Sequence, residues 1–272
     1  MPTTIQQGFE ALKQNLQITT LQSTTVSTRQ QNVRGAVAKE LIVIDDFLTG
    51  SYKRSTMIAP LKEADVDVFV VLDSKYYESN GQAGLLDKVK RVLKKTYPDT
   101  PEISRNGQAV TITFSDFKVD VVPAFNRIGG GYVIPDSILK RWISTNPKKH
   151  VDVWSDANKA HNGDLVPLIK MIKAWNKTHS TLLHSFHLET MTLNILNNVT
   201  ISDFPPSVRY VFDKMRSQVS YVVADHAGYG GDLGAYLDTS SKKADVVGRL
   251  ETAYQRAKDA ETLASSCRKI QV

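Results

Sequence analysis

The sequence predicts an α+β protein of two lobes, in which a sheet lobe backed by helices precedes a helical lobe. Two apolar, β-branched runs in the first half, Val66–Leu72 and Lys118–Val122, have the composition of strands. From about residue 136 onward, apolar residues recur at helical spacing instead. We therefore expect a catalytic lobe at 1–135 and a helical lobe at 136–272, with a cleft between them.

Helices are predicted before the first strand. Apolar residues at helical spacing indicate one helix near residues 9–16, and a polar loop is expected at 19–28. A second apolar stripe predicts a long helix that Gly50 ends. The stripe consists of Val33, Val37, Leu41, Ile44 and Leu48.

Further elements follow the first strand. A charged helix is expected at roughly 83–96, and Ala109–Phe114 and Lys118–Val122 read as a hairpin joined by a short polar connection. Pro123 is expected to end the second strand, because proline lacks the N–H that a central strand uses. The three glycines at 129–131 predict a flexible loop.

The helical lobe contains three clear patterns, at Leu165–Lys177, Leu182–Leu196 and Val246–Ala264. In the first of them, one face is apolar and the other carries Lys170, Lys173 and Lys177. The lysines are read in two ways, as a solvated helix face or as contacts to an anionic ligand. No chemistry is assigned to the histidines at 161, 184 and 187, because histidines near helices are usually structural or exposed.

Composition narrows the function classes. The formal charge of +6 and the isoelectric point of about 9.2 suit an anionic partner such as nucleoside triphosphates or nucleic acid. The single cysteine, Cys267, excludes an intramolecular disulfide and a zinc cluster built from cysteines. Met1–Gln7 lacks the pattern of a signal peptide, and no apolar run approaches ~18 residues. We expect a cytoplasmic protein with no membrane span.

Three acidic residues in apolar strands point to the chemistry. Asp65 and Asp67 are two residues apart, so both side chains should lie on one face of the strand. Asp120 interrupts the run Val119–Val122 in the same way. Carboxylates in such surroundings are unfavourable unless a cation compensates them. If the two strands are neighbours, the three carboxylates converge.

A pair of divalent cations would relieve their repulsion, and such a pair, roughly 3.5–4 Å apart, suits in-line phosphoryl transfer. Oxygen ligands and a phosphate substrate favour two Mg²⁺ or Mn²⁺ ions over zinc. The alternative is that the aspartates cap strand ends or form salt bridges, which is the commoner role of a single strand aspartate.

A Gly50-Ser51 turn precedes the first of these strands. Such a turn can present backbone N–H groups and a hydroxyl to a phosphate, although Gly-Ser is also a common helix end. Together with Asp65-Val66-Asp67 and the stretch 119–125, it resembles the polymerase-β-type nucleotidyltransferase superfamily. Lys173-Ala174-Trp175-Asn176 and 185–189 narrow the resemblance to the bacterial cGAS/DncV-like nucleotidyltransferases (CD-NTase, SMODS family) of CBASS anti-phage systems. That resemblance covers about residues 35 to 195.

The resemblance implies a bilobed polymerase-β-like fold, with a mixed sheet and a long spine helix in the first lobe. It implies that Asp65, Asp67 and Asp120 hold the metals, and that Asp120 also helps deprotonate the attacking ribose hydroxyl. The nucleotide would be bound by Gly50, Ser51, Lys173, Ser185 and Phe186. Each residue of the helical lobe has another reading: Lys173 as solvated, Ser185 as a helix cap and Phe186 as core.

The implied function is the synthesis of a cyclic di- or trinucleotide second messenger from nucleoside triphosphates, with release of pyrophosphate, in anti-phage signalling. A separate effector would bind the product, and a regulatory protein partner is left open. An activating nucleic acid is not supported, because no Cys/His zinc insertion is found. We expect no fused effector domain after the last helix. The alternatives are transfer onto an RNA, protein or small-molecule acceptor, and a silent nucleotide-binding protein.

Overall fold

The computed structural model describes residues 4–100 and 102–270, without the side chains of 264–270, among which Cys267 falls. The chain forms two compact units, Ile18–Asp152 and Met1–Gln17 with Val153–Val272. The sequence-based lobes were 1–135 and 136–272. The units differ from them because the chain after residue 131 continues the sheet, and because the first helix packs against helices of the C-terminal part.

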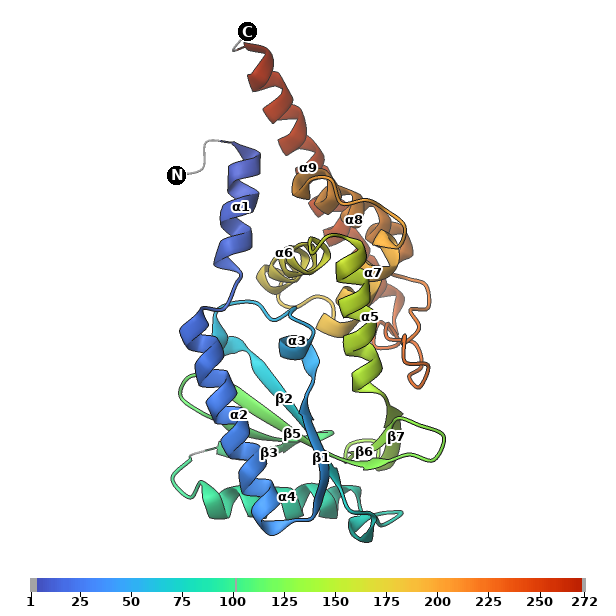
Figure 1. Ribbon diagram of the computed structural model, residues 1–272. Helices are drawn as coiled ribbons and strands as arrows, with labels where there is room; N and C mark the ends of the chain where they lie inside the picture. Colours follow the sequence, from blue (N-terminus) through green and yellow to red (C-terminus); the bar gives the residue numbers. More distant parts are fainter. Residues whose placement is uncertain (1–3, 101, 271–272) are drawn as a thin grey trace. The chain divides into compact units, whose positions relative to one another are not determined.

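The first unit, Ile18–Asp152, is built on a mixed sheet (Figure 1). Its main path runs in the order β1-β2-β5-β4-β3, and only the β2–β5 pair is parallel. A short extension, β6 and β7, continues from the end of β5. The strands are β1 Val43–Leu48, β2 Asp65–Leu72, β3 Glu102–Asn106, β4 Ala109–Thr113, β5 Lys118–Asn126, β6 Tyr132–Asp136 and β7 Arg141–Thr145.

One face of the sheet is covered by two helices, α2 (Thr20–Glu40) and α4 (Gln82–Thr96). Alternate residues of β2, Val66, Val68 and Val70, are buried with both helices in one apolar cluster. The intervening residues Phe69 and Val71 belong to a second cluster on the opposite face. Because side chains alternate along a strand, Asp65 and Asp67 belong to this second face, away from α2 and α4.

The predicted long helix ends earlier than its stripe suggested, and it also begins earlier. α2 starts at Thr20, within the expected loop, because Thr19 and Gln22 form a reciprocal capping box. The stripe then leaves the helix at Leu41, and its last two members lie in β1, where Ile44 is 56% exposed. β1 pairs with β2 and stacks Phe47 on Phe69, so strand pairing prevails over the helical spacing.

Two further expectations for this unit were wrong. β5 continues through Pro123 to Asn126, because the ladder with β4 stops at Val121 and Pro123 there pairs only with Val70 of β2. The change to helices does not begin at 136, since β7 follows and α5 begins only at Pro147. The helix expected at roughly 83–96, which is α4, and the β4–β5 hairpin are confirmed, and the three glycines at 129–131 lie in a loop with positive φ angles.

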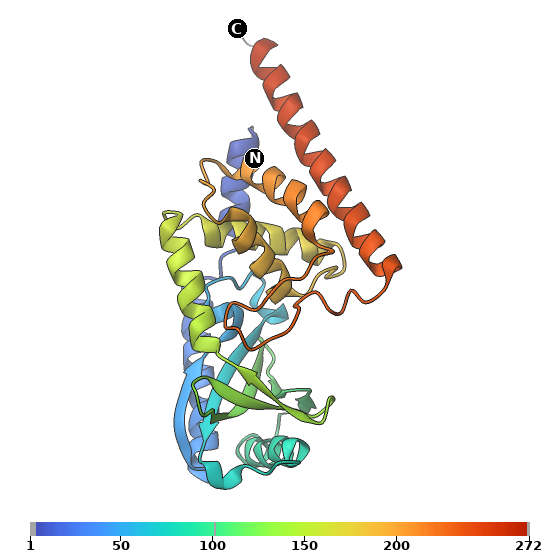
Figure 2. The ribbon, with the colours of Figure 1, turned by 90° about the vertical axis from the view of Figure 1, so that its right-hand side faces the viewer.

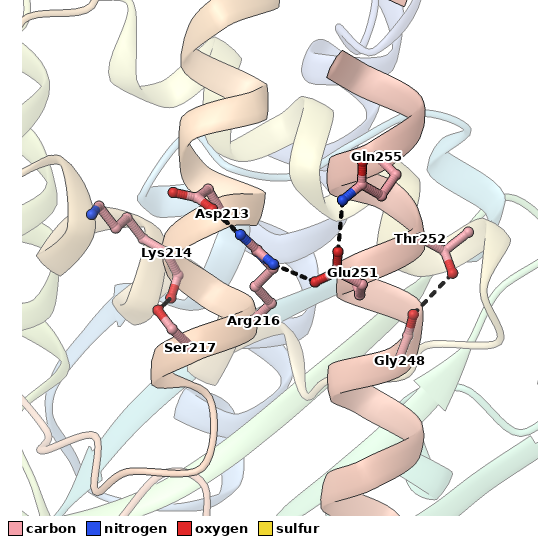
Figure 3. Close-up of polar contacts among 8 residues, drawn as sticks. All are labelled: Asp213, Lys214, Arg216, Ser217, Gly248, Glu251, Thr252 and Gln255. Atoms are coloured by element: carbon pink, nitrogen blue, oxygen red, sulfur yellow. Dashed lines mark hydrogen bonds and ion pairs between the residues drawn. The ribbon is translucent and has the colours of Figure 1, made fainter. Parts of the chain in front are cut away.

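The second unit consists of helices (Figure 2). They are α1 Ile5–Asn15, α6 Leu165–Thr178, α7 Ser185–Leu196, α8 Phe204–Gln218 and α9 Ser240–Ile270, and α5 Pro147–Ala160 contains the boundary between the units. α8 and α9 lie side by side, joined by Arg216, which contacts Asp213 on its own helix and Glu251 on α9 (Figure 3). No helix in the described part of the chain is long and apolar enough to cross a membrane.

Candidate active site

The acidic residues of the two parallel strands lie side by side. Asp67 of β2 is in direct register with Asp120 of β5, and Asp65 begins the same strand two residues earlier. Residues in register on neighbouring parallel strands point to the same sheet face, so the three aspartates share one face of the sheet on adjacent strands. Asp65 is exposed, whereas Asp67 and Asp120 are half-buried.

The electrostatics of Asp120 reflect this clustering. Burial raises its pKa, the hydrogen bond from Thr111 lowers it, and the nearby negative charge of Asp65 raises it again. The Thr111 hydroxyl donates to Oδ1 of Asp120 at 2.6 Å, and Thr111 faces Asp120 from β4. The net effect is a raised pKa, so the carboxylate is a stronger base than an ordinary aspartate.

The Gly50-Ser51 turn lies against these carboxylates. It follows β1 rather than a long helix, and it opens the short helix α3 (Gly50–Lys53). Gly50 has φ +64°, and a Cβ at this position would lie 1.7 Å from Oδ2 of Asp67. The neighbouring Thr49 N–H donates to the backbone oxygen of Asp67 at 3.0 Å. Only glycine therefore allows the turn to approach Asp67 so closely.

The donor set fits a magnesium-type ion in chemistry, because it consists of carboxylate oxygens, and the pKa of Asp120 is raised first by burial and further by the like charge of Asp65. Its present side-chain arrangement is not that of a closed site. Among the residues whose side chains the structure describes, 4–100 and 102–263, no group of three or more His, Cys, Asp or Glu is placed so that it could already hold an ion.

Two of the three lysines of α6, Lys170 and Lys173, are buried rather than solvated, and Lys177 is half-exposed. Lys170 and Lys173 are 5% and 7% exposed, because other parts of the same unit cover them. Lys170 donates to Oε1 of Gln17 at 2.7 Å, and burial together with the charge of Lys173 lowers its pKa to about 8. Lys173 forms an ion pair of 2.7 Å with Glu189 of α7, whose side chain is fully buried.

Ser185 and Phe186 occupy the first turn of α7. Ser185 is exposed and follows the N-cap residue His184, so Ser185 is not itself the cap that the sequence suggested as an alternative. The ring of Phe186 stacks on the buried Trp154, with centroids 5.5 Å apart and planes 21° apart, and remains half-exposed. One side of the Phe186 ring thus packs against the core, and part of the ring is accessible to solvent.

Two residues that the sequence did not indicate shape these groups. Thr111 holds Asp120, and Glu189 neutralises Lys173. A threonine in a strand is too common to be a signal. The glutamate at 189 stands among apolar residues of a helix, and a buried charge of this kind predicts a partner, which could have been sought among the lysines of α6.

The sequence of this chain is similar to those of known proteins. The family model of the Second Messenger Oligonucleotide or Dinucleotide Synthetase domain matches residues 3–158. Cyclic AMP-AMP-AMP synthase of an Acinetobacter species is 31% identical over 208 residues, which cover 71% of this chain. The chain spans about 59% of the length of that relative.

Solved structures show the same fold at low identity. The Bradyrhizobium diazoefficiens CD-NTase CdnG in complex with GTP superposes with a TM-score of 0.78 at 13% identity, covering 96% of this chain and 93% of that one. The CdnC:HORMA-deltaN complex of E. coli MS115-1 gives a TM-score of 0.72 at 16% identity, covering 96% and 91%. These likenesses confirm the expected α+β nucleotidyltransferase fold.

The family match spans the capped helix α2, the Gly-Ser turn and the three clustered aspartates Asp65, Asp67 and Asp120. The chain belongs to the Second Messenger Oligonucleotide or Dinucleotide Synthetase family.

Proposed function

We propose that this protein links nucleoside triphosphates into a cyclic di- or trinucleotide second messenger, with release of pyrophosphate. The observation that carries the proposal is the register of Asp67 with Asp120, with the Asp65 charge beside them. The family match and the 31% identity to a cyclic AMP-AMP-AMP synthase support this reaction class. Transfer onto an RNA, protein or small-molecule acceptor is the alternative that the test below must separate.

We propose that Asp65, Asp67 and Asp120 hold two Mg²⁺ or Mn²⁺ ions. Bound there, divalent cations would supply the charge that stabilises an in-line phosphoryl transfer. The clustering of the carboxylates supports this, because a cation would relieve the like-charge effect that Asp65 exerts on Asp120.

The side chains of the sheet unit would divide the work between them. Asp120 would accept the proton of the attacking ribose hydroxyl, since its raised pKa makes it a better base and Thr111 fixes the orientation of its carboxylate. Gly50 and Ser51 would bind the triphosphate, because the glycine brings the backbone of the turn against Asp67.

The helical unit would contribute Lys173, Ser185 and Phe186 to nucleotide binding. The exposed hydroxyl of Ser185 lies at the positive end of α7, which suits a phosphate group. The half-exposed ring of Phe186, stacked on Trp154, suits stacking with a base. The pairing of Lys173 with Glu189 makes its contact with phosphate the least supported of the three roles.

We also propose a cytoplasmic role in CBASS anti-phage signalling, in which a separate effector binds the product. The solved CdnC:HORMA-deltaN complex of a protein with the same fold supports a regulatory protein partner for this chain as well.

The test is to incubate the purified protein with labelled ATP, GTP, CTP and UTP and Mg²⁺ or Mn²⁺, then treat the mixture with phosphatase. Phosphatase-resistant oligonucleotides are expected. The double variant Asp65→Ala/Asp67→Ala should lose the product by at least about a thousandfold. Asp99→Ala, which removes an exposed carboxylate from a loop of the same unit, is the control that should keep full activity.

Label transferred only to added RNA or protein would refute the messenger synthase in favour of the alternative. Undiminished product in the double variant, with an unchanged circular dichroism spectrum, would refute the site itself.

A further inference from the structure

The start of α7 is held by a residue that lies about fifty positions later in the chain. The main-chain N–H of His184 donates to the phenol oxygen of Tyr236 at 3.0 Å. The same oxygen lies 3.0 Å from Nδ1 of His187, and the rings of His184 and Tyr236 stack with centroids 3.6 Å apart. Tyr236 therefore contacts both the N-cap residue of α7 and the third residue of the helix.

The phenol oxygen of Tyr236 lies between two nitrogen atoms. Because it accepts from the main-chain N–H of His184, its own hydrogen is available for Nδ1 of His187. With Nδ1 as the acceptor, the ring proton of His187 is on Nε2, an atom that is buried and has no hydrogen-bond partner among the described residues. Burial lowers the pKa of His187 to about 4, so the ring is neutral under ordinary conditions.

The loop that carries Tyr236 is itself ordered by Asp232. One carboxylate oxygen of Asp232 accepts from the N–H groups of Val223 and Gly234, both at 2.9 Å. Gly234 lies directly against His187, since a Cβ there would be 3.1 Å from Cε1 of the imidazole. The loop between α8 and α9 is therefore packed onto the start of α7, within the same compact unit (Figure 1).

The arrangement replaces the usual capping box. In that motif, the side chain of the third helical residue accepts from the N–H of the N-cap residue. Here the third residue is His187, its side chain does not reach back directly, and the N-cap residue makes no side-chain cap of its own. The phenol of Tyr236 bridges the two positions instead.

We propose that Tyr236 is a positioning residue for nucleotide binding, acting by fixing the first turn of α7, which carries Ser185 and Phe186. This inference rests on the proposed function, because it concerns the phosphate and base contacts assigned to that turn. Burial raises the pKa of the Tyr236 phenol, so Tyr236 contributes orientation rather than charge.

The decisive variant is Tyr236→Phe, which keeps the ring against His184 and removes only the bridging oxygen. Tyr221→Phe is the matched control, because Tyr221 is 70% exposed and belongs to the same loop. Binding is measured by calorimetry with Mg²⁺ and the α,β-methylene analogues of ATP, GTP, CTP and UTP. The analogue that binds the wild-type protein best is then used for each variant.

Tyr236→Phe should weaken binding of that analogue about five- to twentyfold. KM should rise by a similar factor while kcat changes less than about twofold, because positioning acts on the bound ground state as well. Both effects should be the same at about pH 6 and about pH 9, since neither His187 nor Tyr236 titrates in that window. In the free protein, amide hydrogen exchange at 184–187 should become faster in Tyr236→Phe and not in Tyr221→Phe.

Substitutions of His187 distinguish loss of the bridging hydrogen bond from a general loss of structure. His187→Asn keeps an acceptor near the position of Nδ1 and should bind the analogue within about threefold of wild type, whereas His187→Phe should resemble Tyr236→Phe. Faster exchange with unchanged affinity in Tyr236→Phe would overturn the positioning role while leaving the proposed function intact. Failure of the wild-type protein to bind any of the four analogues would instead refute the proposed function and this role with it.

Discussion

The two units treat their charged residues in opposite ways. In the sheet unit, Asp65, Asp67 and Asp120 bring like charges together on one face, and the pKa of Asp120 is raised in consequence of burial and of Asp65. In the helical unit, Lys173 and Glu189 are buried together as an ion pair of 2.7 Å. The first arrangement is unfavourable without a ligand, whereas the second is complete within the unit.

The comparison distinguishes two roles that a charged residue in apolar surroundings can have, one functional and one structural. A like-charge cluster adds nothing to the stability of the fold, so its presence supports the functional role and the cation proposed for it. A compensated pair is costly chiefly when one partner is removed, so its presence alone indicates structure. The predictions below test whether the Lys173–Glu189 pair affects mainly stability and whether the aspartate cluster affects mainly activity.

The largest expected effect is on the stability of the helical unit. Lys173→Met would leave the fully buried carboxylate of Glu189 without its cation, and should lower the free energy of unfolding by about 3–5 kcal/mol. Urea denaturation followed by circular dichroism measures it. The double variant Lys173→Met/Glu189→Met should be more stable than Lys173→Met alone, because Glu189 is then no longer left as a buried charge without Lys173. A loss below about 1 kcal/mol in the single variant would contradict the structural reading of the pair.

A smaller effect is expected from a substitution in the Gly50-Ser51 turn, which lies against Asp67. Gly50→Ala would place a methyl group 1.7 Å from Oδ2 of Asp67, at a backbone φ of +64°. Asp67 must move, so the rate of product formation should fall about a hundredfold, with a stability loss of about 1–2 kcal/mol. Initial rates and urea denaturation report the two effects.

Gly35→Ala is the control for that substitution, because Gly35 lies in α2 with nothing within 4 Å of the added Cβ. It should leave the rate unchanged and should not lower the stability, since alanine favours a helix. Equal activity of Gly50→Ala and Gly35→Ala would show that the approach of the turn to Asp67 is unimportant.

The smallest expected effect is a shift in pH dependence. Thr111→Val removes the hydrogen bond that stabilises the ionised Asp120, so the pKa of Asp120 should rise further. In the proposed mechanism the ionised form of Asp120 is the base. Activity should therefore be lost as pH falls through that pKa, and the acid limb of kcat/KM should move to higher pH. The rate well above the limb should change little.

The stability of this variant should depend on pH in the opposite direction to its activity. A carboxyl whose pKa is higher in the folded than in the unfolded state destabilises the fold as it ionises, so Thr111→Val should be most destabilised above the raised pKa. Thr113→Val is the matched control on the same strand, since the buried Thr113 hydroxyl has no hydrogen-bond partner within the described chain. An identical acid limb in both variants would contradict the role of Thr111.

The helices with strong periodicity and the two central strands could be predicted locally, because their apolar patterns match what they bury. The boundary after α2 could not, since the same apolar residues fit a helical stripe and a strand, and pairing of Phe47 with Phe69 decided between them. The strands β6 and β7 were likewise missed, because β7 has only β6 as a neighbour and its pattern is weakly apolar.

For the candidate site as well, some features could be predicted from the sequence and others could not. By itself, the sequence determined that three aspartates lie in apolar strands after a Gly-Ser turn, because a carboxylate in such a run is rare and period-two spacing sets its face. Only the tertiary structure decided that Asp67 stands beside Asp120, that Thr111 and Glu189 are the partners of distant residues, and that Tyr236 caps α7. These contacts join residues far apart in the chain, and local patterns carry no information about which distant side chains meet.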